Sequence, residues 1–458
     1  MKNFLCTLAF SLLFVGLSAQ NAIPLLPDVD DQPPMTMGDC VGYALEHNPN
    51  LASIQLSEMA NRHQIAAVKA TALPQLNATG QYLYNYALPQ QLLPGEVFGQ
   101  PGTTIPVKFG VANNMTGMLE LQQLLYSKSY RTGLEAAEAS QSLVALNTFQ
   151  TKEELVYNVV AIYLQIQITE KQKEILQANL DRLDQLLSIA QIQFSEGLIK
   201  KIDVDQLRVN RTNLQTELQS VELGAAQQLN LLKFYMGMAP EEDLSIGEYL
   251  NEGDDYPLYD NLRLQENTSL RLLDLRIALN QLESDNARAG YYPTLSAFVR
   301  YGWQGQTDKL FSNNDLYDIQ GSANGVIGLN LQVPIFDGFQ KRHEIQQLEV
   351  EQNQLHLNRE YLSNSIRMEF ANANETLEQN KRLLSTQEEN MQLAEELYNV
   401  TKLSYQEGVA PLTELLNAET SLKEAQNQYL TALLQVNLAE LDYSRVSGQL
   451  AAMLRNNN

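Results

Sequence analysis

Two long stretches without glycine or proline constrain this sequence more than any other feature, and they cover residues 134–196 and 339–407. At about 1.5 Å per residue, continuous helices over them would be about 95 and 105 Å long. An average globular helix has about 11–12 residues, so neither stretch fits a compact domain. Along the second stretch a heptad runs through Phe370, Leu377, Leu384, Met391, Tyr398 and Tyr405. A seven-residue period sustained this long predicts a coiled-coil seam.

Each long stretch ends at a glycine and is followed by a second helical stretch. Gly197 precedes a predicted helix from about 203 to 235, and Gly408 precedes one from about 412 to 446. A glycine can adopt the left-handed conformation that ends a helix and reverses the chain. The pattern therefore predicts two very long antiparallel helical hairpins with their tips at residues 197 and 408.

The surroundings of the two hairpins match at a nearly constant offset, which predicts an internal duplication. Gly197 matches Gly408 at an offset of 211, and residues 121–126 match 331–336 at 210. Further upstream, residues 70–76 match 289–295 at 219. We expect repeat 1 over residues 36–237, repeat 2 over 266–450, and an equatorial segment of the molecule between them at 238–265.

Apolar and polar side chains alternate within each repeat, which predicts two strands per repeat, at about 75–86 and 107–124 and at about 294–304 and 323–335. About ten residues of alternation with aromatics toward one end is the weak signature of a transmembrane β-strand. Taken alone, it equally fits amphipathic strands of a soluble sandwich. Four strands cannot close a barrel, whereas an oligomer that pools them can, since open edges are not tolerated in lipid. The polar segments at about 87–106 and 305–322 are expected to be extracellular loops.

The amino terminus has the pattern of a secretory signal peptide over residues 1–19. Lys2 is followed by an apolar run and by the small-residue site Leu17-Ser18-Ala19. Residues 20–35 are expected to be a disordered linker, and residues 451–458 a C-terminal tail. Beyond the signal peptide Cys40 is the single cysteine, which excludes an internal disulfide and favours a small buried apolar side chain.

Charge and motifs exclude several classes of function. Lys and Arg number 31 against 54 Asp and Glu, a net charge of −23 that would repel a nucleic acid. The four histidines lack any metal-ligand spacing, and no P-loop, nucleophile elbow or Cys–His pair is present. We therefore expect no enzyme activity, no cofactor and no metal site.

Three motifs carry a resemblance that spans residues 37–450. They are residues 287–295 (ARAGYYPTL), residues 329–338 (LNLQVPIFDG), and the hairpin tip 405–419, which ends in LLNAE. Together they resemble the TolC-type outer-membrane efflux proteins. The resemblance implies a mainly α fold with a transmembrane β-barrel, in which three identical chains close twelve strands in the outer membrane of a Gram-negative bacterium and continue as an α-helical periplasmic cylinder.

The resemblance also implies a function and partners. The homotrimer would be the passive exit duct of a tripartite efflux system, working with a periplasmic adaptor and an inner-membrane transporter. An alternative that remains open is the outer-membrane duct of a type I secretion system, whose cargo is a polypeptide. A trimeric coiled-coil scaffold is the alternative of another class, although two glycine-tipped hairpins beside paired strands argue against it.

The same resemblance suggests functional residues at the tips. The family's constriction uses acidic residues six and nine positions after the second tip glycine, which correspond here to Glu414 and Asn417, with Asp203 equivalent to Glu414 in the first hairpin. Glu414 could equally be a helix-surface charge, and Asp203 a partner of Lys200, Lys201 or a neighbouring chain. The tips at which adaptors dock correspond to the list Gly197, Leu198, Gly408, Val409 and Pro411. Pro411 stands where many relatives carry a serine, and a simple turn with Leu198 or Val409 packed back on the bundle is also compatible with these residues.

Overall fold

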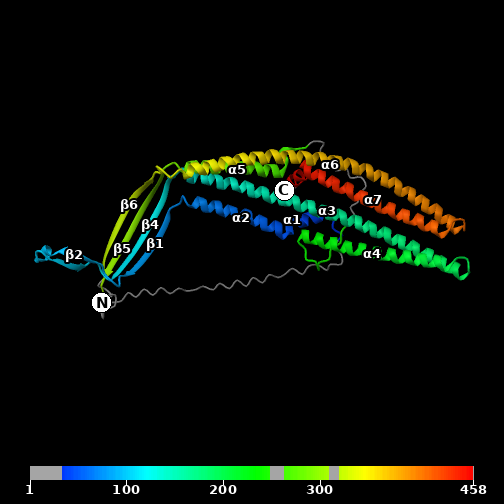
Figure 1. Ribbon diagram of the computed structural model, residues 1–458, viewed down its shortest axis with the longest axis horizontal. Coiled ribbons are helices and arrows are strands. Elements are labelled where there is room, and N and C mark those ends of the chain that lie inside the picture. The colour runs from blue at the N-terminus through cyan, green and yellow to red at the C-terminus, as the bar shows by residue number, and fades with distance from the viewer. Residues whose placement is uncertain (1–32, 248–261, 309–318, 457–458) are drawn as a thin grey trace.

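The computed structural model describes residues 33–247, 262–308 and 319–456. The expected signal peptide, most of the linker and parts of the equatorial segment and of the 305–322 loop lie outside these ranges. Helices account for most of the described chain, and a sheet lies at one end (Figure 1). The helices are α1 (Met37–His47), α2 (Pro49–Ala70), α3 (Lys128–Ser195), α4 (Lys201–Met236), α5 (Thr268–Ala289), α6 (Gln340–Gln406), α7 (Leu412–Ser447) and α8 (Gln449–Asn456).

The two long helices and their return helices are confirmed. α3 has 68 residues and α6 has 67, and they pack along α4 and α7 respectively. The Ser127 hydroxyl caps α3 by accepting a hydrogen bond from the Tyr130 N–H at 3.1 Å. The predicted seam of α6 is confirmed as well, because all six heptad side chains are buried or half-buried. Within the described ranges, no helix is both long enough and apolar enough to span a bilayer.

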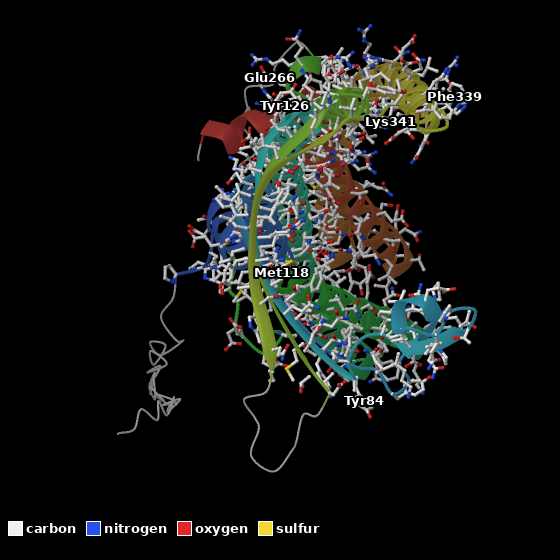
Figure 2. The ribbon with its side chains drawn as sticks, turned by 90° about the vertical axis from the view of Figure 1, so that its left-hand side faces the viewer. Tyr84, Met118, Tyr126, Glu266, Phe339 and Lys341 are labelled. Carbon is white, nitrogen blue, oxygen red and sulfur yellow. The ribbon has the colours of Figure 1, made fainter. Side chains whose placement is uncertain are left out.

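The four principal strands form one antiparallel sheet in the order β1-β4-β5-β6. Within the described residues, β1 and β6 each pair along one side only, so the sheet has two open edges. Figure 2 shows Tyr84 and Tyr126 at opposite ends of this sheet, with Met118 between them. The bounds are β1 (Gln75–Tyr84), β4 (Asn113–Ser127), β5 (Thr294–Thr307) and β6 (Gln320–Gln332).

The register places most of the apolar residues of the four strands on one face. Leu121 lies opposite Leu76 on one side and Val299 on the other, and Val299 lies opposite Ile327. The chain leaves this face uncovered, since Ile327 is 81% exposed. A soluble sandwich would cover such a face with a second sheet. The described chain therefore does not form such a sandwich over this face.

Three predictions about the strands and loops need correction. The strand expected at 107–124 begins at Asn113, because Gly110 takes a left-handed conformation (φ 97°) that interrupts it. The segment expected as a loop at 87–106 contains strands β2 (Gln90–Pro94) and β3 (Thr104–Lys108), which pair as a separate hairpin. β6 ends at Gln332 rather than 335, consistent with Pro334, which has no N–H to donate to a strand pair.

An apolar cluster holds the middle of the helical region together. Cys40 is fully buried there with Leu51 and Val159, as expected for its thiol. The described end of the equatorial segment closes over this cluster: the Tyr163 hydroxyl donates to the Gly247 carbonyl at 2.7 Å. Residues 451–456, expected to be a tail, form most of α8, which packs against Val156.

Candidate gate at the hairpin tips

The two hairpin tips are built by the same hydrogen bonds. Gly197 and Gly408 have positive φ angles of 78° and 73°. The N–H of Leu198 donates to the Gln193 carbonyl at 2.8 Å, and the N–H of Val409 donates to the Ser404 carbonyl at 2.8 Å. This bond across a left-handed glycine is the Schellman motif that ends helices. The predicted turns at residues 197 and 408 are confirmed.

The first turns of the return helices differ in how they are capped. In α4, the Asp203 carboxylate accepts a hydrogen bond from the Lys200 N–H at 3.0 Å. The equivalent position at the start of α7 is Pro411, which has no N–H. Glu414, the counterpart of Asp203, therefore cannot make this bond. Among the described residues, Asp203 forms no ion pair with the side chain of Lys200 or Lys201, and its contact with Lys200 is through the backbone N–H.

Glu414 and Asn417 lie on an exposed face of α7. Their neighbours Leu415 and Ala418 are buried, so the buried and exposed positions alternate with helical spacing. Asn417 borders a groove between α7 and α4, to which Gln206 also contributes. Gln206 stands nine residues after Gly197, as Asn417 does after Gly408. The structure thus brings Asn417 next to the first hairpin and leaves Glu414 free at the surface.

An apolar core from four helices supports the tips. Leu183 of α3, Leu207 of α4, Tyr398 of α6 and Leu415 of α7 belong to it, and each is at most 2% exposed. This core joins the two hairpins at their tip end, where α4 and α7 begin (Figure 1). A movement that separates the hairpins must expose these side chains.

A polar cluster that the sequence analysis missed lies inside the same bundle. The Arg182 guanidinium of α3 lies over the Tyr398 ring, 5.4 Å from its centroid. Burial raises the pKa of Glu419 on α7, while Arg182 and Lys423 act in the opposite direction. Lys423 also forms an ion pair with Glu217 of α4 at 2.8 Å. The available sequence signal was a carboxylate that continues the helical spacing of the apolar Leu412, Leu415 and Leu422, but Arg182 and Tyr398 come from other helices.

Tyr405, the last residue of the α6 seam, lies between the hairpins close to their tips. Its hydroxyl donates to the Gln193 side-chain oxygen at 3.5 Å, which links α6 to α3. Burial raises the pKa of this tyrosine, and the charge of Asp203 adds to the effect. The end of the seam is therefore polar, and it connects the two tips.

The apolar residues next to the tip glycines point into solvent. Leu198 is 74% exposed and Val409 is 82% exposed. Within the described chain the two side chains therefore do not pack back on the bundle, although a Schellman turn frequently brings the residue after the glycine into apolar contact with the preceding helix. In the described ranges, no three His, Cys, Asp or Glu side chains are arranged to hold a metal ion.

Comparison with known proteins gives a consistent result. The family model described as "Outer membrane efflux protein" matches residues 41–238 and 261–449. Outer membrane protein TolC of Salmonella enteritidis is 21% identical over 426 residues, covering 88% of this chain and 80% of the relative. The toluene efflux pump outer membrane protein TtgF of Pseudomonas putida is 24% identical over 410 residues, covering 86% and 79%.

A solved structure shows the same fold. The CmeC outer membrane channel of Campylobacter jejuni superimposes with a TM-score of 0.73 at 14% sequence identity, covering 92% of this chain and 88% of that one. The family match includes both hairpins, both tips and all four principal strands. This chain belongs to the outer membrane efflux protein family.

Proposed function

We propose that three copies of this chain form a passive exit duct across the outer membrane, as the outer component of a tripartite efflux system. The observation that carries the proposal is the four-stranded sheet, which has one continuous apolar face and two open edges. Such a sheet is stable in lipid only when its edges are paired. Pairing β6 of one copy with β1 of the next would close twelve strands from three chains.

Exposed apolar side chains on the helices support the same assembly. On α4, Ile202, Val209 and Leu223 lie at multiples of seven residues and are exposed. On α6, Leu393 and Val400 are exposed with the same spacing. A heptad that the chain itself does not cover is suited to a helix of a neighbouring copy. The helices of three copies would thus continue the barrel as a hollow cylinder.

The gate of this duct would lie at the hairpin tips. Glu414 is exposed and is not used as a helix cap, so three copies could present three carboxylates to one axis. Carboxylates at such a constriction favour cations. Asn417, one helical turn further along α7, would contribute no charge. The Asp203 carboxylate already accepts a hydrogen bond from the Lys200 N–H at the start of α4.

The tips themselves would be where a periplasmic adaptor docks. Leu198 and Val409 offer exposed apolar side chains beside the left-handed Gly197 and Gly408. Pro411 shapes the second tip by removing one donor. The similarity to TolC and to a toluene efflux pump protein supports export as the role, with energy coming from an inner-membrane transporter.

Single-channel conductance in planar bilayers tests the proposal. We expect the purified mature oligomer to give small, cation-selective steps, and Glu414→Ala to increase the conductance and reduce the cation selectivity. Glu396→Ala is the matched control, because it removes an exposed carboxylate from the other helix of the same hairpin. Equal effects of the two variants would move the gate away from Glu414. No conductance from a folded oligomer that is extracted from membranes would contradict the duct.

A further inference from the structure

The four principal strands contain one acidic and one basic side chain, and these two face each other. Glu120 of β4 is directly opposite Arg300 of β5 in the register. A guanidinium nitrogen of Arg300 donates to a carboxylate oxygen of Glu120 at 2.9 Å. All other side chains of these strands are uncharged. The sheet therefore carries a single ion pair with no net charge.

A neighbouring aromatic ring holds the arginine in place. The Arg300 guanidinium lies over the ring of Phe298, 4.4 Å from its centroid, on the same face of β5. Phe298 is opposite Gly328 of β6, and a Cβ at Gly328 would lie 2.6 Å from the ring. The aromatic ring thus lies against a strand position at which any side chain larger than that of glycine would clash with it. Three strands fix the guanidinium, which limits its freedom to follow a passing solute.

The pair lies on the polar face of the sheet. Gln122 and Thr116 of β4 share the face of Glu120, whereas Leu119 and Leu121 belong to the apolar face. If the chain forms the proposed duct, the apolar face contacts lipid and the polar face lines the lumen. The present inference rests on that proposed function. Three copies would then place three Glu120–Arg300 pairs in one ring around the lumen.

We propose that this ring is a specificity element of the duct, in which Glu120 serves as the built-in counter-ion of Arg300 and prevents the lumen from retaining anionic solutes. A fixed guanidinium binds carboxylates and phosphates through parallel hydrogen bonds. Three uncompensated guanidinium groups would bind a multivalent anion on its way out. With Glu120 occupying each guanidinium, the ring is neutral, and anions pass without being held.

Block of the channel by inorganic pyrophosphate, added from the extracellular side, tests this inference. The duct is reconstituted in planar bilayers at about 10 mM ionic strength, where charges act over roughly 30 Å. We expect Glu120→Gln to lower the half-blocking concentration at least tenfold relative to wild type. The double variant Glu120→Gln/Arg300→Gln should return to the wild-type value, because its ring is again neutral. Glu120→Ala removes the same charge and serves if Glu120→Gln does not assemble.

Glu96→Gln is the matched control, because it removes an exposed acidic side chain between β2 and β3 without touching the pair. If pyrophosphate blocks all conducting variants equally weakly, the proposed role of the Glu120–Arg300 pairs is wrong, but the proposed duct is not affected. Block that is equally strengthened in Glu96→Gln and Glu120→Gln would also overturn it, because overall charge would then explain the effect. A wild-type oligomer that does not conduct would overturn the proposed duct itself.

Discussion

Asp203 and Glu414 occupy the same position after the tip glycines of their hairpins, but only Asp203 caps its helix. The Asp203 carboxylate accepts the Lys200 N–H at 3.0 Å, whereas Pro411 offers no N–H to Glu414. Because of this proline, the Glu414 carboxylate is not used as a helix cap, whereas the Asp203 carboxylate is. This difference underlies the assignment of Glu414, rather than Asp203, to the proposed gate.

The first prediction follows from this asymmetry. Asp203→Ala should destabilise the start of α4 by about 1 kcal/mol, since loss of a capping side chain costs about 0.5–2 kcal/mol. Glu414→Ala should leave the start of α7 unchanged. Hydrogen–deuterium exchange of peptides covering residues 198–206 and 409–417 measures both effects. Faster exchange at the second tip in Glu414→Ala would contradict the assigned difference.

The second prediction concerns the two faces of the sheet. Leu121→Lys should strongly impair assembly, because a lysine on a lipid-facing strand costs about 2–4 kcal/mol near the bilayer midplane. Gln122→Lys is the matched control on the opposite face of the same strand and should assemble normally. The yield of folded oligomer in outer-membrane extracts distinguishes the two. Equal yields would contradict the assignment of the apolar face to lipid.

The third prediction concerns the buried carboxylate of Glu419. Burial raises its pKa above the ordinary value of 4.5, so the folded state holds a proton over a pH range in which the unfolded chain has lost it. Stability therefore falls as pH rises through this range. Glu419→Gln should raise the midpoint of thermal unfolding at pH 7.5, by roughly 1–4 °C, and the difference should vanish below about pH 4.5.

Circular dichroism of the detergent-solubilised protein measures that midpoint. Glu424→Gln is the control, because Glu424 lies on the same helix and is exposed. A lower midpoint in Glu419→Gln at pH 7.5 would show that the attraction of Arg182 and Lys423 for the carboxylate outweighs the cost of its burial.

The fourth prediction concerns Cys40. Burial raises the pKa of this thiol to about 11 from 9.0, and the side chain is 0% exposed. Because the thiolate is the reactive form, the mature folded protein should react with a disulfide reagent at pH 8 at least about 100-fold more slowly than the unfolded chain. The reaction is followed by the absorbance of the thiol that the disulfide reagent releases. A Cys40→Ser/Leu198→Cys variant, with its thiol at an exposed tip, should react rapidly and shows that the reagent is active.

Much of the helical architecture could be predicted from the sequence, because its signals are local. The absence of glycine and proline over residues 134–196 and 339–407 permits uninterrupted helices, and Gly197 and Gly408 allow the chain to reverse. The heptad that ends at Tyr405 specifies the face that is buried. The strand boundaries were less accurate, because no periodic pattern specifies the pairing of β2 with β3 or the left-handed conformation of Gly110.

The sequence by itself determined the long hairpins, their tips and the alternation of the strands, since helical and strand periods are properties of neighbouring residues. Only the tertiary structure decided which charged side chains pair with one another and which remain exposed to solvent. Glu120 and Arg300 are 180 positions apart, and their pairing depends on the register between β4 and β5. The cluster of Arg182, Tyr398 and Glu419 depends on the packing of three helices, which no local pattern encodes.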